Sequence, residues 1–348
     1  MFMIKPKLKY FLVVLFSIYS LNSYSQIEFL RSFRILENML NGTDFFDLSK
    51  AVFAVENAYY DDNLQQSAFD NRINYYAEIC HSLAKAGNIR YTGPDFSSVN
   101  TQAAVFTFMT DSIPMQIGDS IFYHPPFQYN YEDFAGRKDW SNMFVTTLMA
   151  TGKGNCHSMP LLYKLIMNKL GEKCWLTLAP NHMYVKAYTL QSGLYNIELT
   201  TGYHPTDAWI MASGFIHIDA IRNSLYMDTL TVKEEIALCL FDLAQGYDRK
   251  YPGNNGIFVS ECCQTVLKYY PDCINARLMQ AEMMTRRYLK MDDKESFSAQ
   301  KLKEEMEHAY TEIHWLGYRK MPEKMYREWL RNSSSYNEKA PNHKINGY

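Results

Sequence analysis

The chain has 348 residues, of which 47% are hydrophobic and 21% are charged. This is the composition of a globular protein, with enough apolar residues for a large core in one or two domains. The formal net charge is −2, so the sequence lacks the basic footprint of a nucleic-acid-binding protein. We therefore expect no nucleic-acid partner.

Residues 1–25 have the features of a signal peptide. Three lysines precede a short apolar run at residues 11–19, and Ser23-Tyr24-Ser25 forms a cleavage site of the small-x-small type. The apolar run is too short to span a bilayer. We expect export to the periplasm or the cell exterior, with no membrane contact beyond this signal. A retained N-terminal anchor is the alternative. Cleavage would remove three lysines and take the net charge from −2 to −5.

The cysteine pattern argues against a metal centre. An odd count in an exported chain leaves at least one thiol free or paired with another molecule. The spacing is irregular and contains neither a CxxC pair nor a zinc or calcium ligand pattern. We therefore predict no metal and no cofactor. The seven cysteines are Cys80, Cys156, Cys174, Cys239, Cys262, Cys263 and Cys273.

Helical periodicity dominates the N-terminal part of the chain. Apolar residues at helical spacing predict helices over about 27–40, 48–60, 67–85 and 103–109. We group them as an N-terminal helical layer, residues 26–110, and find no candidate chemistry in it.

A loop-rich aromatic segment follows at residues 111–140. A long aromatic loop just ahead of a candidate nucleophile is suited to form the wall of a substrate cleft. Our candidates for that wall are Tyr129, Tyr131 and Trp140. Simple packing of these rings over a sheet is the alternative interpretation.

Residues 152–202 carry the candidate chemistry. Apolar side chains recur at i, i+3, i+4 and i+7 over residues 159–170 and predict a central, buried helix. Cys156 lies at its N-terminal end. Asn155 is a helix-capping residue type and a candidate for the oxyanion or cleft position. Because Pro160 would interrupt the first turn, the regular helix is expected to begin slightly later.

Alternating patterns then predict three strands, near 175–178, 183–188 and 195–199. A glycine turn joins the last two as an antiparallel hairpin. His182 opens the second strand, and Glu198 follows it by an even number of residues, centred close to the turn. The two side chains are therefore expected on one face of the hairpin and near each other.

These residue types fit a thiol nucleophile, its base and the partner that orients the base. A thiol at a helix N-terminus beside an imidazole is favoured as the thiolate. We predict Cys156 as nucleophile, with its N–H as an oxyanion donor, and His182 as acid and base. Glu198 would orient His182, with Asp207 or no acid at all as alternatives. The chemistry would be attack on an amide carbonyl, a thioester, and release to water or an amine.

The same residues resemble the transglutaminase-like branch of the papain-like cysteine enzymes, in its short bacterial form. The resemblance covers about fifty residues. It implies a central helix packed on an antiparallel sheet, with Cys156, His182 and Glu198 in the Cys, His and Asp places. Two departures, Glu instead of Asp and no Trp after the histidine, bear on activity more than on fold. The matching runs are Gly154-Asn155-Cys156-x-Ser158, Pro180-Asn181-His182 and Tyr195-Asn196-Ile197-Glu198-Leu199-Thr200.

The C-terminal part is again predicted to be helical. The run YYPDCINARLMQAE, at residues 269–282, resembles the proline-then-alanine boundary between tetratricopeptide repeats. That resemblance implies helical hairpins able to hold a protein partner. The tail at residues 332–348 is polar and predicted to be disordered. Helices are predicted over about 233–249, 258–270, 275–289, 302–316 and 322–330.

Together these patterns predict an α+β fold and a cysteine-dependent enzyme. The expected function is an exported hydrolase or acyltransferase acting on peptide or isopeptide bonds, with hydrolysis favoured because water is always present. The alternative is an inactive transglutaminase-like scaffold that engages a protein partner through its helices. A metal site of Cys156, His182 and His204 is a weaker hypothesis. The expected regions are a leader (1–25), a helical layer (26–110), a transglutaminase-like core (111–225), a tetratricopeptide-like region (226–331) and a tail (332–348).

Overall fold

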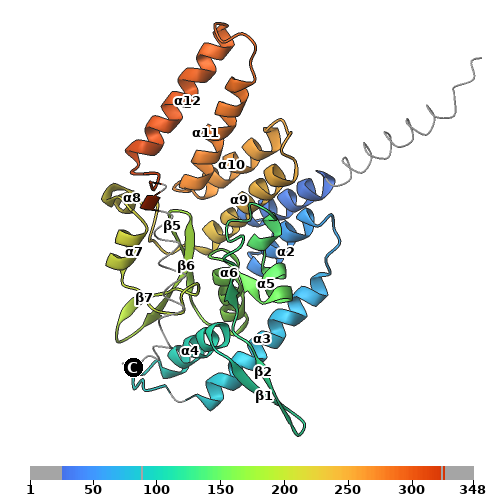
Figure 1. Ribbon diagram of the computed structural model, residues 1–348, viewed down its shortest axis with the longest axis vertical. Coiled ribbons are helices and arrows are strands. Elements are labelled where there is room, and N and C mark those ends of the chain that lie inside the picture. The colour runs from blue at the N-terminus through green and yellow to red at the C-terminus, as the bar shows by residue number, and fades with distance from the viewer. Residues whose placement is uncertain (1–25, 88, 323, 326–348) are drawn as a thin grey trace, which may run out of the picture.

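A computed structural model describes residues 26–87, 89–322 and 324–325. The predicted leader, the predicted tail and most of the helix expected at 322–330 lie outside these residues. The described chain mixes helices with small sheets, which agrees with an α+β class at that general level (Figure 1). None of the described helices combines the length and apolar character needed to cross a membrane.

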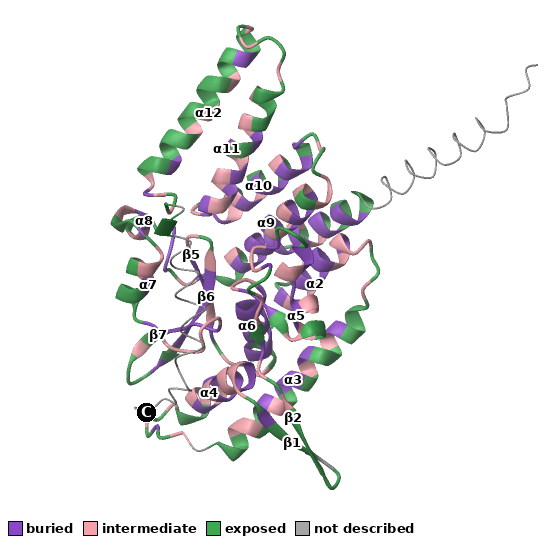
Figure 2. Ribbon diagram, in the orientation of Figure 1, coloured by how far each residue is buried: buried purple, intermediate pink, exposed green. Residues whose placement is uncertain are grey.

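Helix α6 (Ser158–Lys169) lies at the centre of the fold. Every residue from Ser158 to Met167 is buried, as the colouring of Figure 2 shows. The helices α3 (Gln66–Ala86), α4 (Phe96–Thr110) and α5 (Val145–Thr151) pack against it, and strands cover its other side. The predicted central helix is confirmed, although it is buried all round and not along one stripe.

The strands beside α6 form a three-stranded antiparallel sheet in the order β5-β6-β7. They are β5 (Trp175–Ala179), β6 (His182–Thr189) and β7 (Gly193–Ile197). A two-residue turn joins β5 to β6, with a proline followed by Asn181 at φ 54°. Proline first and a positive-φ residue second is the pattern of a type II turn, and asparagine tolerates that conformation. The turn sets His182 as the first residue of β6.

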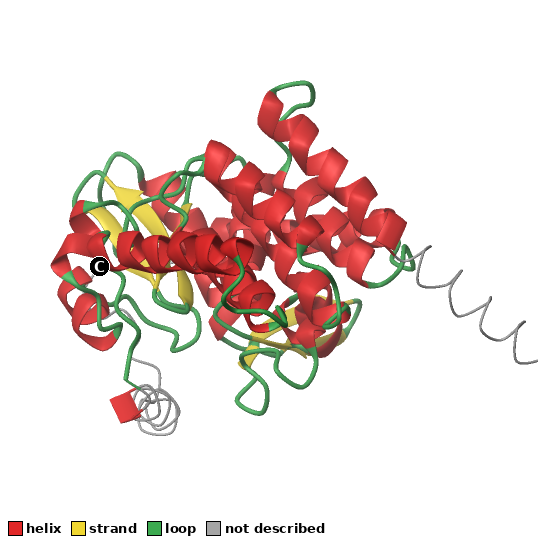
Figure 3. Cartoon of the chain, turned by 90° about the horizontal axis from the view of Figure 1, so that it is seen from above, coloured by secondary structure: helices red, strands yellow, loops and turns green. Residues whose placement is uncertain are grey.

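Two of the N-terminal helices pack against the C-terminal part of the chain. The first helix (residues 26–41) and α2 (Leu48–Tyr59) pack against α9 (Val232–Lys250). The ring of Phe29 meets that of Tyr247 edge-on at 5.2 Å. One hydrophobic core therefore joins both ends of the described chain, and Figure 3 shows most of the helices on one side of the larger sheet, with a few short helices on the other.

The segment expected to be loop contains strands that the sequence patterns did not predict. An exposed antiparallel hairpin, β1 (Ile113–Ile117) and β2 (Ser120–His124), turns at Gly118. The two-residue strands β3 (Gln128–Tyr129) and β4 (Lys153–Gly154) pair in parallel. Short, mostly exposed strands carry no clear alternation of apolar and polar residues, which is why periodicity missed them. The short helix η1 (Trp140–Met143) follows β3, and two more short helices, α7 (Asp207–Ser213) and α8 (Ile218–Arg222), follow β7.

Four consecutive helices form the C-terminal part, and each packs against the next. They begin with α9, whose N-terminus carries a capping box between Thr231 and Glu234. The last two project from the body of the molecule (Figure 1), and α12 buries only Ala299 and Ile313. The helices after α9 are α10 (Ile257–Tyr269), α11 (Ile274–Leu289) and α12 (Phe297–Trp315).

Candidate functional site

Cys156 lies in the turn that leads into α6. The Asn155 Oδ1 atom accepts the N–H groups of His157 at 2.9 Å and Ser158 at 3.0 Å. In return, Ser158 Oγ accepts the Asn155 N–H at 3.1 Å, which gives the reciprocal pattern of a capping box. Pro160 has no N–H to offer the Cys156 carbonyl. Regular helix therefore starts at Ser158, as the proline predicted.

The structure corrects the role expected of Asn155. This residue is completely buried. Its Nδ2 atom donates to the Phe134 carbonyl at 2.8 Å and to Met143 Sδ at 2.9 Å. Because the whole amide is engaged inside the protein, Asn155 shapes the turn that holds Cys156 and faces neither a cleft nor an oxyanion position.

Two glycines are required on the approach to this turn. Gly152 ends α5 with φ 71°, a left-handed conformation that glycine adopts without cost. A Cβ atom on Gly154 would lie 2.8 Å from both Leu148 Cδ1 and Ser158 Oγ. A larger residue at position 154 would force the side chains of Leu148 and Ser158 to shift.

Cys156 is the one cysteine of the seven that is not buried. All seven are free thiols. Burial raises the pKa of other thiols, for example those of Cys80 and Cys174 to about 12, which makes them poor nucleophiles. The Cys156 sulfur lies 3.8 Å from the carbonyl oxygen of Asn181, in the turn before His182. The partly exposed thiol thus lies against the start of β6.

His182 and Glu198 form a direct side-chain pair. His182 Nε2 and Glu198 Oε2 are 2.5 Å apart. In the β6–β7 register, Val185 faces Ile197, so Glu198 falls opposite residue 184 and is a diagonal neighbour of His182. Diagonal positions are about 7–8 Å apart at the backbone. The long glutamate side chain spans that distance.

Thr200 holds the second oxygen of the Glu198 carboxylate. The Thr200 N–H and hydroxyl donate to Glu198 Oε1 at 3.0 and 2.7 Å. Sequence reasoning missed this residue. The signal for it was the Glu-x-Thr spacing just after a strand, where a side chain readily bonds the backbone two residues on.

The His182–Glu198 pair is ionic. The side chains are only 10% and 5% exposed. Burial lowers the pKa of His182, but the Glu198 charge and hydrogen bonds with Cys156 and Glu198 outweigh it and hold this pKa well above its usual range. Burial raises the pKa of Glu198, yet attraction to His182 and the Thr200 hydrogen bonds leave it below its usual range. A protonated imidazole therefore faces a carboxylate at neutral pH.

The Cys156 thiol lies close enough to His182 to contribute to the raised pKa of this histidine. The structure thus brings together Cys156, His182 and Glu198, which lie far apart in the sequence. A thiol beside an imidazole that is itself bonded to a carboxylate is the set of groups that nucleophilic catalysis by a thiol requires.

The alternative acid and the metal hypothesis find no support in this geometry. The Asp207 carboxylate accepts from Asn196 Nδ2 at 2.8 Å and lies 3.4 Å from Lys186 Nζ. His204 Nδ1 pairs with the Asn196 carbonyl at 3.0 Å. Among the described residues, no three His, Cys, Asp or Glu side chains are grouped to hold a metal ion.

A second histidine, partly buried, lies directly beside the nucleophile. His157 Nδ1 lies 3.0 Å from the Met143 carbonyl, and Nε2 lies 3.0 Å from Asp242 Oδ2 on α9. Burial lowers the pKa of His157, but the Asp242 charge and these hydrogen bonds raise it to about 9. The resulting imidazolium adds positive charge next to Cys156. No local sequence signal indicates this pair, because Asp242 is 85 residues away.

The three aromatic residues expected in a cleft wall divide into two groups. Tyr129 pairs with Gly154 across β3 and β4, and its ring meets that of Tyr131 at 4.9 Å. Both tyrosines therefore lie alongside the Cys156 turn. Trp140 is 7% exposed and packs beneath Arg249, whose guanidinium is 5.3 Å from the ring. The expectation that Trp140 lines a cleft is wrong, because it is part of the packing against α9.

A small cavity of about 30 Å³ adjoins the ion pair, and His182 and Glu198 form part of its wall. A space of this size holds about one water. Trp209 of α7 and Met321, which follows α12, close it. Neither residue was singled out from the sequence, because each reaches the site only through the packing of distant segments.

Comparison with known proteins gives no match: no family model, no curated protein and no solved structure is significantly similar to this chain. The function must therefore be argued from the geometry of the site.

Proposed function

We propose that this chain is an exported cysteine-dependent hydrolase of peptide or isopeptide bonds, built on a transglutaminase-like core. Cys156 is the nucleophile, His182 the acid and base, and Glu198 the residue that orients the imidazole. The observation that carries the proposal is that the Cys156 thiol lies beside His182, where it contributes to the raised pKa of that histidine, while His182 Nε2 lies 2.5 Å from the Glu198 carboxylate.

The charges at the site support a defined sequence of steps. The raised pKa of His182 suits this residue to receive and hold the proton of the Cys156 thiol. The thiolate attacks the amide carbonyl carbon, and the new C–S bond produces a tetrahedral oxyanion. As the C–N bond breaks, His182 gives its proton to the departing amine and leaves a thioester on Cys156. Water then attacks the thioester while His182 takes its proton, and the acid product departs.

The backbone around Cys156 is suited to hold the oxyanion. The first N–H groups of a helix have no partner within it and point out of its N-terminal end. The Cys156 N–H belongs to the turn that opens α6 and is our candidate donor. The His157 imidazolium, bonded to Asp242 at 3.0 Å, adds a fixed positive charge that favours negative charge on the sulfur.

The proposal is tested by thiol labelling of the intact mature protein. Limiting iodoacetamide is applied from about pH 5 to 9, and labelled peptides are mapped by mass spectrometry. We expect Cys156 to react selectively and to keep its reactivity at acid pH, about tenfold or more above the same thiol in the denatured chain. The variant His182→Ala should lose this acid-pH reactivity. His217→Ala, which changes a half-exposed histidine elsewhere, serves as the control.

A second measurement addresses the substrate. The variant Cys156→Ser is used to trap peptides from a library, and the wild-type protein is assayed for cleavage of those it retains. If Cys156 reacts like a denatured thiol, and His182→Ala changes nothing, the catalytic proposal fails. The scaffold hypothesis then remains, in which the same core is inactive and the protein acts by binding.

A further inference from the structure

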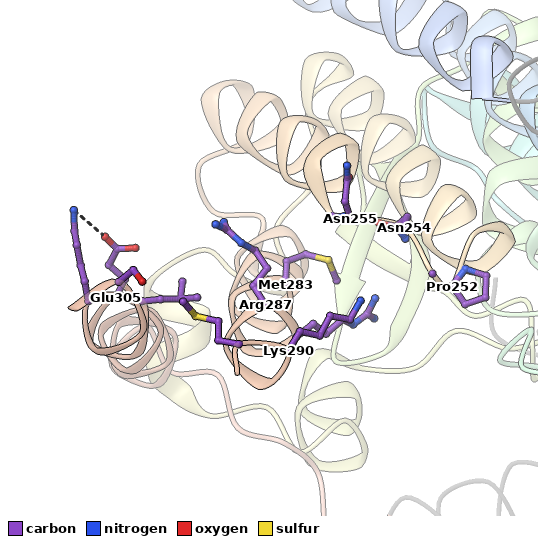
Figure 4. A pocket seen from close by; sticks show the side chains of 14 residues that line it. Pro252, Asn254, Asn255, Met283, Arg287, Lys290 and Glu305 are labelled. Atoms are coloured by element: carbon purple, nitrogen blue, oxygen red, sulfur yellow. Dashed lines mark hydrogen bonds and ion pairs between the residues drawn. The ribbon is translucent and has the colours of Figure 1, made fainter. Parts of the chain in front are cut away.

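A second cavity lies far from Cys156, among the C-terminal helices. It has a volume of about 640 Å³, within the range typical of ligand sites. The loop at residues 252–256 forms one wall, α11 the floor and α12 the opposite wall (Figure 4). We call this space the helical groove.

The charge of the helical groove is opposite to that of the whole chain. Four cations line it, Arg286, Arg287, Lys290 and Lys301, against the single carboxylate of Glu305. This gives a net lining charge of +3, in a chain whose formal charge is −2. A local concentration of positive charge attracts ligands that carry negative charge.

Two of these cations are available to a ligand. Arg286 is paired with Asp248 at 2.7 Å, and Lys301 lies 3.8 Å from Glu305. Arg287 and Lys290 are exposed, and neither forms a salt bridge with any residue in the part of the chain that the structure describes. Figure 4 shows both side chains projecting from α11 at the groove.

The groove also has an apolar component. Met283 is 3% exposed, and its sulfur would lie 3.3 Å from a Cβ placed on Gly256. Met291 and Leu302 also line the space. Flexible, polarisable methionine side chains accommodate varied apolar groups. None of the lining residues is aromatic, so the groove lacks the stacking surfaces that single-stranded nucleic acids use.

We propose that the helical groove binds an acidic peptide segment of another protein. Carboxylates of the peptide pair with Arg287 and Lys290, and an apolar side chain packs on Met291 and Leu302, which are partly exposed in the groove. The chain's own C-terminal segment is excluded as the occupant by charge: residues 326–348 contain four Lys or Arg and two Glu, a net of +2. This site is independent of the cysteine chemistry.

The test is fluorescence anisotropy with the full mature protein and a labelled acidic peptide. The probe is a peptide of about twelve residues, rich in Asp and Glu around a central Met-Leu pair. Matched probes replace the acidic residues with Lys, or the Met-Leu pair with Gly-Gly, and heparin is the non-peptide polyanion. We expect the acidic Met-Leu peptide to bind best, with an affinity that falls as salt rises.

Charge-reversal variants locate the site. Arg287→Glu with Lys290→Glu should weaken binding of the acidic peptide by about tenfold or more. Lys268→Glu with Lys303→Glu reverses two exposed cations outside the groove, on α10 and α12, and should have little effect. Circular dichroism and thermal melting confirm that both double variants are folded.

Two results would overturn the proposal. Equal loss of binding in the groove and control variants would show that only general charge matters. Binding of heparin as tight as that of the peptide, with no loss on Gly-Gly substitution, would show a polyanion site and not a peptide site. Cys156 labelling is expected to be unchanged in the groove variants, so the two proposals fail or stand separately.

Discussion

The His182–Glu198 ion pair makes a quantitative prediction about stability. Glu198→Gln keeps the size of the side chain and removes its charge, so it creates no cavity. At 2.5 Å and an effective dielectric constant of about 20, the attraction is roughly 7 kcal/mol before desolvation. Desolvation of both groups offsets much of this, and loss of one partner from a buried pair costs about 3–5 kcal/mol. We expect Glu198→Gln to lower the free energy of unfolding by about 3 kcal/mol near pH 6.

The pH dependence of that difference follows from the directions of the two pKa shifts. The pKa of Glu198 is lowered in the folded protein. Its contribution to the free energy of unfolding is therefore complete above the pKa that it has in the unfolded chain, and it is lost as acid protonates the carboxylate. The pKa of His182 is raised in the folded protein. Its contribution to the free energy of unfolding is therefore complete below the pKa that it has in the unfolded chain, and it declines as the pH rises toward the pKa of the folded protein. The stability gap between wild type and Glu198→Gln should be widest from about pH 4.5 to 6.5 and narrow on both sides.

The assay is urea denaturation followed by circular dichroism at a series of pH values. Asp207→Asn is the matched control, because it removes a neighbouring carboxylate that is 62% exposed and does not contact His182. Its effect should stay below about 1 kcal/mol at every pH. A Glu198→Gln effect under about 1 kcal/mol, or one that is flat across the series, would refute the ion pair.

Substitutions at three further positions, with matched controls, test the surroundings of Cys156. His157→Gln should lower the free energy of unfolding by about 2–3 kcal/mol near pH 6. The difference from wild type should disappear above the His157 pKa of about 9, and urea denaturation at a series of pH values measures it. Gly154→Ala should lower the free energy of unfolding by about 1–3 kcal/mol and slow the labelling of Cys156, because the added Cβ atom meets neighbouring side chains. Gly253→Ala is the control and should be nearly neutral, because the space around its Cβ is open. Asn181→Gly should preserve both the labelling of Cys156 and the midpoint of thermal unfolding. Asn181→Val should lower both, because a β-branched residue at φ 54° is strained by about 1–2 kcal/mol.

Most of the longer elements were predictable from the sequence. The apolar stripe over 159–170 predicts α6 within one residue at each end, and Pro160 predicts its delayed start. Alternation predicts β5 and β6, and helical periodicity predicts α9, α10 and α11. These patterns are reliable because the residues of one face repeat at a fixed spacing wherever the element is long.

Register and packing decided the contacts of the candidate site. The even spacing of His182 and Glu198 predicts one shared face of a hairpin, but the register makes them diagonal neighbours, and that offset suits glutamate. Whether Glu198 or Asp207 approaches the imidazole depends on the path of the chain after β7, which carries no periodic signal. The sequence could therefore offer both acids, and only the fold distinguishes them.

By itself, the sequence determined the central helix, the hairpin beside it and the order of the Cys, His and carboxylate residues. The tertiary structure alone decided that Asn155 and Trp140 are packing residues, that Asp242 pairs with His157, and that a basic groove forms between the C-terminal helices. The physical reason is the distance along the sequence over which each kind of interaction acts. Periodic patterns record which face of one element is buried, whereas side-chain partners from distant segments are set by how whole elements pack together.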